Sequence, residues 1–235
     1  MVRSTMWGCA EVFYMDKISL IKKVLVSFEQ SSTSIKYDKL YFWNDGPNKI
    51  KQITVSFGIT EWGNLKKLVE SYVKKKGPVK GLESYLPKIG KESLVNDKAF
   101  IDLLKESCKD NVMAMCQEEA FNEMYIDPAL AWCKKGGLVL PLSQLVIADS
   151  FLHSGSILPF LRNKFSETLP SAGGDEKAWV TAYTKTRREW LKNHENKILN
   201  NTVYRTNLFL SLIEKNDWNL DSDKIDANGV IIVNS

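Results

Sequence analysis

Residues 27–63 read SFEQSSTSIKYDKLYFWNDGPNKIKQITVSFGITEWG and contain two strand-like runs, one turn and four acidic residues. Glu29 closes an apolar helical pattern, and Asp45 lies in the turn NDGPN. Runs rich in aromatic and β-branched residues on both sides of that turn predict two strands joined as a hairpin. This part of the chain therefore predicts a helix end and a hairpin turn that each present one carboxylate.

The two carboxylates are expected to differ in protonation. A carboxyl group at the end of an apolar helix is partly desolvated, which favours its protonated form and suits a general acid. A carboxylate in a polar turn stays ionised and suits a general base. Inverting glycoside hydrolases use such a pair, roughly 6.5–9.5 Å apart, to admit a water molecule. Because most Glu and Asp side chains only solvate the surface, the pair needs support from the rest of the chain.

Composition and charge exclude several classes of protein. The chain has 235 residues, of which 44% are hydrophobic and 26% charged, which is typical of a soluble globular protein. Its net charge of +4 and the lack of a basic stripe among aromatics argue against a nucleic-acid partner. No apolar run is long enough to span a membrane, and no secretory signal peptide is recognisable. We expect a monomer without a nucleic-acid or membrane partner.

The cysteines and histidines do not predict a metal site. The four cysteines show no CxxC pair and no zinc spacing, and the chain has only two histidines. We therefore expect no metal, no cofactor and mostly buried free thiols, although a bridge between Cys108 and Cys116 stays open. The cysteines are Cys9, Cys108, Cys116 and Cys133.

The periodicity along the chain predicts a mainly helical α+β fold with a small antiparallel sheet in the N-terminal third. Residues 1–14 are aperiodic and are expected to be a poorly ordered extension. Residues 15–235 are expected to form a single two-lobed catalytic domain with a cleft between the lobes. Expected helices are residues 16–29, 65–76, 97–125, 127–136, 138–152, 157–165, 175–199 and 203–212, and expected strands are residues 37–43, 52–58 and 228–233.

One acidic residue falls inside the most apolar helix. Asp149 lies in the run LVIADSFL, where a lone carboxylate would cost several kcal/mol unless it were paired. Arg187, Arg188 and Arg205 are candidate partners, because one arginine can bind a buried carboxylate and offer its remaining donors to a second acid. The simpler alternative is that Asp149 lies on an exposed side of the helix. The more specific alternative is that Asp149 belongs to a buried ion cluster that positions Glu29.

Six short segments in order resemble the family-46 chitosanases, which share a two-lobed, lysozyme-like fold. The resemblance covers most of residues 25–235. The segments are SFEQSS from Ser27, GNLKKLVESY from Gly63, YIDPA from Tyr125, ADSFLHSG from Ala148, GGDE from Gly173 with TRR from Thr186, and VNS from Val233.

This resemblance implies the endo-hydrolysis of a β-1,4-linked glucosamine polymer with inversion at the anomeric carbon. It places Glu29 on the general acid, Asp45 on the general base and Thr54 near a threonine that helps to hold the attacking water. It also places Asp149, Arg187 and Arg205 on an ion cluster behind the acid. Tyr41 and Trp62 are expected to contact the substrate. An extracellular or periplasmic location is implied as well.

The chain departs from the family in four respects. The interval from Glu29 to Asp45 is shorter, and the interval from Asp45 to Thr54 is longer. An arginine that follows the base in the family is missing. Asn64 stands where the family usually has an aspartate that binds the substrate's ammonium group, and Glu61 is a candidate to replace it.

Two alternatives to a chitosanase stay open. The first is a lytic enzyme that cleaves peptidoglycan or a partly acetylated glycan, which Asn64 and the basic net charge favour. The second is a non-catalytic glycan-binding protein whose residues Tyr41, Trp43 and Trp62 stack on sugars. Packing of these aromatics against the small sheet is the simpler interpretation of the same pattern.

Overall fold

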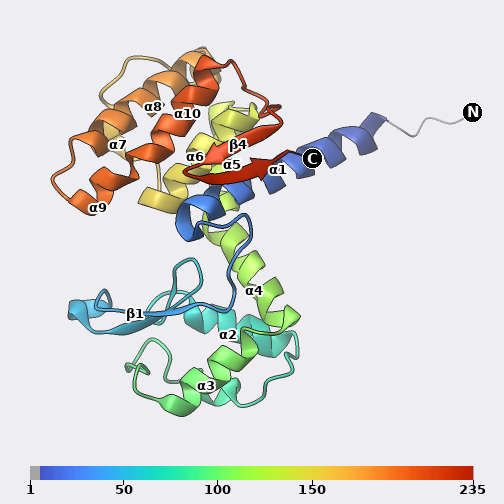
Figure 1. The fold of residues 1–235 in the computed structure, drawn as a ribbon, viewed down its shortest axis with the longest axis vertical. Coiled ribbons are helices and arrows are strands. Elements are labelled where there is room, and N and C mark those ends of the chain that lie inside the picture. The colour runs from blue at the N-terminus through green and yellow to red at the C-terminus, as the bar shows by residue number, and fades with distance from the viewer. Residues whose placement is uncertain (1–5, 235) are drawn as a thin grey trace, which may run out of the picture. The chain divides into compact units, whose positions relative to one another are not determined.

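The chain divides into two compact units. The computed structural model describes residues 6–234, with side chains from Asp16 onward. Residues 35–123 form one unit, here called the sheet unit, and the segments before and after it form the second, here called the helical unit (Figure 1). The helical unit is therefore built from two separate parts of the sequence. Residues 1–5 of the expected N-terminal extension lie outside the described residues.

The helical unit contains seven of the described α-helices and one β-hairpin. Its helices are α1 (Met6–Gln30), α5 (Asp127–Gly136), α6 (Pro141–Ser154), α7 (Pro159–Arg162), α8 (Glu176–Lys192), α9 (Lys197–Asn200) and α10 (Tyr204–Glu214). Two 3₁₀ turns cover Pro170–Ala172 and Asn201–Val203. Strands β4 (Lys224–Ala227) and β5 (Val230–Val233) pair antiparallel.

Helix α6 is the centre of the helical unit. Every residue from Leu142 to Ser150 is buried, so this helix has no solvent-exposed face over that range. It packs against α1, α5, α8 and α10 (Figure 1). A helix that is apolar all round belongs in the interior of a bundle, and the sequence prediction for residues 138–152 is confirmed in this respect. Any polar side chain on α6 must therefore find its partners inside the protein.

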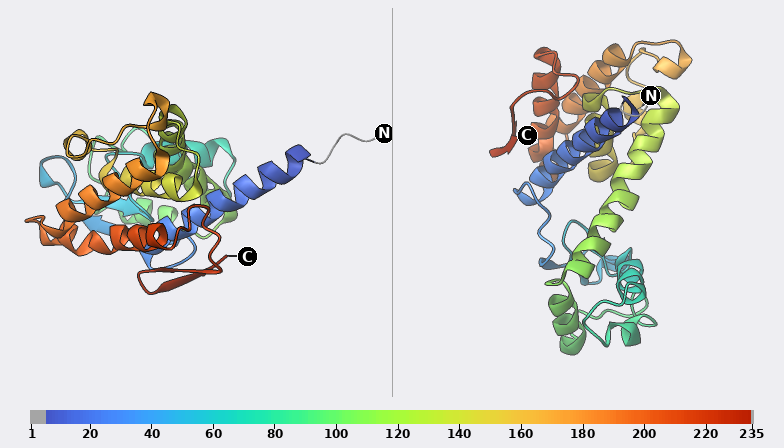
Figure 2. Two further views of the ribbon diagram at one scale, coloured as in Figure 1. Left: turned by 90° about the horizontal axis from the view of Figure 1, so that it is seen from above. Right: turned by 90° about the vertical axis from the view of Figure 1, so that its right-hand side faces the viewer.

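Helix α1 delivers Glu29 to its C-terminal turn. Its buried stripe includes Ile21, Val24, Leu25 and Phe28 and packs against α6. The hairpin β4–β5 lies beside α1 (Figure 2). The helix begins at Met6, so the predicted N-terminal cap at Asp16 is wrong.

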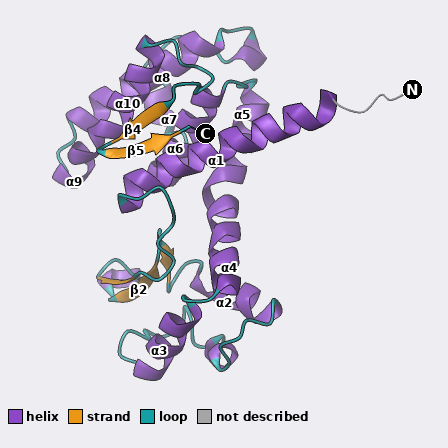
Figure 3. Ribbon diagram, turned by 45° about the vertical axis from the view of Figure 1, so that its right-hand side comes forward, coloured by secondary structure: helices purple, strands orange, loops and turns teal. Residues whose placement is uncertain are grey.

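The sheet unit combines three short strands with three helices (Figure 3). Strands β1 (Leu40–Trp43), β2 (Gln52–Val55) and β3 (Ile59–Thr60) form an antiparallel sheet in the order β1-β2-β3. In register, Tyr41 faces Thr54 and Trp43 faces Gln52. The helices are α2 (Leu65–Lys74), α3 (Lys98–Ser107) and α4 (Asn111–Phe121), and 3₁₀ turns cover Pro47–Lys49 and Leu82–Tyr85.

Several predicted element boundaries are wrong. The single helix expected over residues 97–125 is divided into α3 and α4, because Asp110 caps a new helix by accepting a hydrogen bond from the Met113 amide. A π-helical turn, Asn122–Ile126, then joins α4 to α5. The helix expected over residues 157–165 is only the short α7, and residues 175–199 form α8 and the separate α9. Strands β3 and β4 were not predicted from the sequence.

The described cysteines have free thiols. Cys108, Cys116 and Cys133 are buried and unbridged, while Cys9 lies outside the residues whose side chains are described. Burial raises the pKa of the Cys108 and Cys133 thiols to about 12. Among the described residues, no cluster of His, Cys, Asp and Glu side chains could hold a metal ion. No helix in the described part of the chain is long and apolar enough to cross a membrane.

Candidate functional site

A buried ion cluster lies between three helices of the helical unit. Asp149 on α6 is fully buried, and Arg187 on α8 and Arg205 on α10 are 1% and 3% exposed. The Nη1 atom of Arg187 lies 2.6 Å from Oδ2 of Asp149, and Nη1 of Arg205 lies 2.8 Å from Oδ1. Each carboxylate oxygen therefore accepts a charge-assisted hydrogen bond from a different arginine, and the expectation of a buried cluster at Asp149 is confirmed.

The cluster keeps Asp149 ionised in spite of its burial. Burial alone would raise the pKa of Asp149, but the charges of Arg187 and Arg205 outweigh this effect and hold the pKa below its ordinary value. The pKa of Arg205 is raised, because its attraction to Asp149 and Glu29 exceeds the cost of burying its own charge. Asp149 is thus ionised and Arg205 is protonated over the ordinary pH range.

Arg205 links the buried cluster to Glu29 at the end of α1. Its Nη2 atom lies 2.5 Å from Oε1 of Glu29, whose side chain is 30% exposed. The guanidinium also lies over the ring of Phe28, 5.0 Å from its centroid. The planar guanidinium therefore binds one acid in the interior and a second acid at the surface. This arrangement fixes the position of Glu29 while leaving part of its carboxyl group accessible.

Two further side chains border this cluster. Burial and then the charges of Arg205 and Arg187 lower the pKa of His153 to about 4, so the imidazole is neutral. Burial and the negative charge of Glu29 raise the pKa of Tyr125 to about 12, so this phenol stays protonated. Tyr125 was not predicted from the sequence as a neighbour of Glu29.

Asp45 lies in the sheet unit, in the exposed turn between β1 and β2. The turn is closed by hydrogen bonds from the Gly46 amide to the Ile50 carbonyl and from the Lys49 amide to the Gly46 carbonyl. Its carboxylate oxygen Oδ1 accepts a hydrogen bond of 2.8 Å from Nε2 of Gln52, at the start of β2. The turn carboxylate is therefore tied to a strand and is not a freely moving surface group.

Thr54 lies two residues after Gln52 on β2. Its side chain is 8% exposed, and its Oγ1 atom has no hydrogen-bond partner within the described residues. Since β2 residues alternate between faces, Thr54 and Gln52 lie on the same face of the sheet. A buried hydroxyl without a protein partner is a suitable place for a water molecule to bind.

Glu61 does not have the position expected of a substrate-binding residue. It is fully buried, and its carboxylate accepts hydrogen bonds from the Ile53 and Leu94 backbone amides. These bonds attach the loop around Leu94 to strand β2. With no exposed surface, Glu61 cannot replace a substrate-binding aspartate, so the sequence expectation is corrected here.

The other predicted contact residues of the sheet unit differ in exposure. Tyr41 is 37% exposed and stacks on Trp43, which is 56% exposed, with ring centroids 6.1 Å apart. Trp62 is half-buried, and its backbone amide donates to Oε1 of Gln52. Asn64 is half-buried at the start of α2 and makes no capping hydrogen bond with its side chain. Tyr41 and Trp43 therefore form an exposed aromatic surface on β1.

The predicted residues thus fall into two groups. Glu29, Asp149, Arg187 and Arg205 come together in the helical unit. Asp45, Thr54, Tyr41, Trp62 and Asn64 belong to the sheet unit. Sequence reasoning missed Gln52, although its spacing of two residues from Thr54 on a predicted strand was a signal that both share a face.

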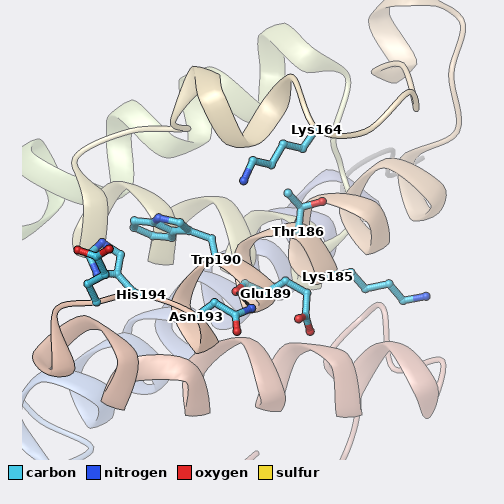
Figure 4. Close-up of a pocket in the computed structure, with 8 residues that line it drawn as sticks. Lys164, Lys185, Thr186, Glu189, Trp190, Asn193 and His194 are labelled. Atoms are coloured by element: carbon cyan, nitrogen blue, oxygen red, sulfur yellow. Dashed lines mark hydrogen bonds between the residues drawn. The ribbon is translucent and has the colours of Figure 1, made fainter.

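A separate groove of about 760 Å³ lies on the outer face of α8 (Figure 4). Trp190 and His194 line it with their rings edge to face, 5.2 Å apart between centroids. Lys164, Lys185 and Glu189 are also among its lining side chains. None of the site residues predicted from the sequence lines this groove, so α8 carries Arg187 on its inner face and an unrelated groove on its outer one.

Comparison with known protein families identifies the family of this chain. The model of the glycosyl hydrolase family 46 matches residues 23–223. No curated protein sequence matches the chain.

The solved structures most relevant here are chitosanases. The native chitosanase of Bacillus subtilis MY002 is 24% identical, with a TM-score of 0.75 over 93% of this chain and 98% of that one. A mutant of the same enzyme complexed with 6 GlcN is 23% identical, with a TM-score of 0.76 over 94% and 98% of the two chains. The GH46 chitosanase of Gynuella sunshinyii in complex with chitotetraose is 18% identical, with a TM-score of 0.74 over 93% and 97%.

These structures show the likeness of fold, and the family model covers the segments that carry Glu29, Asp45 and the ion cluster. The chain is a member of glycosyl hydrolase family 46.

Proposed function

We propose that this glycoside hydrolase cleaves β-1,4 bonds inside chitosan, with inversion at the anomeric carbon. Glu29 is the general acid, Asp45 is the general base, and Thr54 helps to hold the attacking water. The observation that carries the proposal is the chain of ion pairs from Asp149 through Arg205 to Glu29. Burying three charged groups is costly, and the cost is understandable where it orients a reacting carboxyl group.

The reaction needs two proton transfers. Asp45 removes a proton from the water molecule, whose oxygen bonds to the anomeric carbon on one face of the sugar. The glycosidic C–O bond breaks on the opposite face, and Glu29 gives its proton to the leaving oxygen. Exchange with solvent then returns a proton to Glu29 and removes one from Asp45. Inversion follows because water and leaving group occupy opposite faces.

The choice of chitosan is supported by the ligands of similar proteins. One similar chitosanase structure holds 6 GlcN and another holds chitotetraose. In this chain, Tyr41 and Trp43 offer exposed rings on β1 that suit the apolar faces of pyranose units. Trp62 and Asn64 follow β3 in the same unit and are proposed as further contacts.

The test combines product stereochemistry with a change at Glu29. NMR of glucosamine hexamer hydrolysis should show the α-anomer at the new reducing end first. Glu29→Gln should lower reducing-end release from highly deacetylated chitosan by roughly 10²- to 10⁴-fold while still binding the hexamer. A β-anomer formed first, or a Glu29→Gln enzyme with full turnover, would refute the proposed mechanism.

A second substrate class is favoured by one residue. Asn64 stands where the family usually has an aspartate, and an amide attracts an ammonium group less than a carboxylate does. Peptidoglycan or a partly acetylated glycan is therefore the alternative substrate. If the enzyme releases reducing ends from purified peptidoglycan but not from deacetylated chitosan, peptidoglycan and not chitosan is the substrate.

Membership of a glycoside hydrolase family disfavours the other expectation from the sequence, a glycan-binding protein without catalysis. Glu29→Gln separates it from a hydrolase, since a binding protein would retain its glycan affinity and show no turnover before or after the change. We also propose that the protein acts as a monomer outside the cell, extracellularly or in the periplasm, where a polymeric substrate is accessible. Sedimentation of the protein with and without hexamer tests the monomeric state.

A further inference from the structure

Both polar atoms of the Gln52 side-chain amide form hydrogen bonds within the sheet unit. Gln52 is only 4% exposed. Its Nε2 atom donates to Oδ1 of Asp45 over 2.8 Å, and its Oε1 atom accepts from the Trp62 backbone amide over 3.3 Å. The amide therefore connects the turn carboxylate to the backbone that follows β3. Because its acceptor oxygen is occupied by an N–H donor, the amide group is oriented with Nε2 toward Asp45.

The turn beside Asp45 is held against the same tryptophan. A Cβ atom added to Gly46 would lie 2.7 Å from the Ile50 carbonyl oxygen and 3.2 Å from Cδ1 of Trp62. The backbone of the turn is thus in close contact with the indole ring, and only glycine fits there. The carboxylate itself is exposed, so its orientation depends on Gln52 more than on surrounding atoms.

We infer that Gln52 is a positioning residue for the general base Asp45. The inference rests on the proposed function of Asp45. By donating to Oδ1, Gln52 directs the other oxygen, Oδ2, toward the water whose proton it accepts. The donor is a neutral amide, so it orients the carboxylate without adding a positive charge beside a cationic substrate. The proton accepted by Oδ2 returns to solvent after the products leave.

Strand β2 then supplies both the positioning residue and the water-binding residue. Gln52 and Thr54 are alternate residues on one face, and Thr54 carries the buried hydroxyl described above. A strand held between β1 and β3 fixes their spacing more firmly than a loop does. Gln52 touches Asp45 and not the substrate, so it is a positioning residue and not a catalytic one.

The test is Gln52→Leu, which removes the donor and keeps a side chain of similar size. We expect kcat for the glucosamine hexamer to fall on the order of 10- to 100-fold, with KM changed less than about 3-fold. Loss of a hydrogen bond to the ionised carboxylate disfavours that form. The acidic limb of the kcat–pH profile should therefore move to higher pH. Gln52→Glu keeps an acceptor for the Trp62 amide and should move this limb further, because it adds a like charge.

The matched control is Gln117→Leu in the same unit. Gln117 is fully buried and donates to the Tyr37 carbonyl oxygen over 3.0 Å, so the substitution removes a similar hydrogen bond away from Asp45. We expect this control to lower the melting temperature without moving the pH limb. If Gln52→Leu does not fold, as judged by near-UV circular dichroism, Gln52→Glu decides the question through the pH limb.

Failure of this inference can be told apart from failure of the proposed function. If Asp45→Asn retains wild-type turnover, Asp45 is not the base and the proposed function is wrong. If Asp45→Asn is inactive while Gln52→Leu and Gln52→Glu keep the wild-type kcat and pH limb, only the role of Gln52 is wrong. The double variant should have the same residual turnover as Asp45→Asn alone. If the two substitutions lower turnover independently, Gln52 does not act through Asp45.

Discussion

Arg205 is the residue whose removal should affect stability and catalysis together. Arg205→Ala leaves Asp149 with only Arg187 as a charged partner and leaves Glu29 without its ion pair. We expect the free energy of unfolding to fall by about 3–5 kcal/mol, because a buried charge loses compensation. We also expect kcat to fall. Urea denaturation and hexamer hydrolysis measure the two effects.

Arg188→Ala is the control for that change. Arg188 is adjacent to Arg187 on α8, but its side chain is 33% exposed and pairs with Glu189 at the surface. A surface ion pair contributes about 1 kcal/mol or less, so both stability and turnover should stay close to wild type. Equal losses in Arg188→Ala and Arg205→Ala would contradict a special role for the buried cluster.

His153 should make stability depend on pH. Its pKa is lowered to about 4 in the folded protein, by burial first and then by Arg205 and Arg187, against about 6.5 in the unfolded chain. Between these two pH values the unfolded chain binds a proton that the folded protein does not. The free energy of unfolding should therefore fall as the pH drops from about 6.5 to about 4.

Denaturation of His153→Gln over the same pH range measures that contribution. Glutamine does not titrate, so the fall in the free energy of unfolding should be smaller than in the wild type. Asp149 contributes in the same sense at lower pH, since its pKa is lowered in the folded protein and the stability that this provides is lost as the pH falls through the ordinary range of a carboxyl group. An identical pH slope in both proteins would show that His153 can be protonated without unfolding.

The roles of individual residues were predictable where the chemistry of burial is strict. An aspartate inside an apolar helix needs cationic partners, so the sequence indicated Arg187, Arg188 and Arg205 as candidate partners of Asp149. Glu61 was misplaced because its partners are backbone amides, and every residue of the chain offers one. Nothing in the sequence near Leu94 marks it as the donor to a distant carboxylate.

At the scale of elements, the alternation along β1 makes a prediction about substrate binding. Tyr41 and Trp43 are the exposed residues of β1 and stack on each other, whereas Leu40 and Phe42 are half-buried. Trp43→Ala should raise KM for the hexamer roughly 3- to 10-fold, as expected for a lost stacking contact of about 0.5–1.5 kcal/mol. It should leave kcat nearly unchanged.

Trp43→Phe is the matched variant for this test, because it keeps an aromatic face at the same position. We expect it to recover most of the affinity that Trp43→Ala loses. Intrinsic fluorescence titrated with hexamer gives an independent reading. If Trp43→Ala binds the hexamer as tightly as the wild type does, the aromatic surface of β1 is not part of the substrate site.

Element types were predicted better than element boundaries, for a physical reason. The apolar period continues from Phe100 to Met124, so it gives no sign of the break between α3 and α4. The break is made by Asp110, which competes for the backbone as a cap. Strand β3 has only two residues, and its pairing with β2 depends on tertiary contacts that a short sequence pattern does not encode.

At the scale of the whole molecule, the order of elements along the chain does not indicate which of them belong to the same unit. Helix α1 belongs to the helical unit although residues 35–123 separate it in sequence from all other helices of that unit. The apolar stripe of α1 showed that it needed a partner but not which one. Only the continuous apolar character of α6 indicated a central helix around which distant segments could assemble.

The net charge of the molecule predicts a salt dependence that is unusual for an enzyme acting on a polycation. The protein carries +4, and chitosan with protonated amines is also positive. Like charges slow encounter, and the repulsion is screened when the Debye length falls from about 30 Å at 0.01 M salt to about 10 Å at 0.1 M. We therefore expect kcat/KM for highly deacetylated chitosan to rise severalfold, at most about 10-fold, over that range. Partly acetylated chitosan has fewer ammonium groups and should show a weaker rise. A decrease in kcat/KM with salt for the deacetylated polymer would mean that carboxylates at the substrate site outweigh the charge of the whole protein.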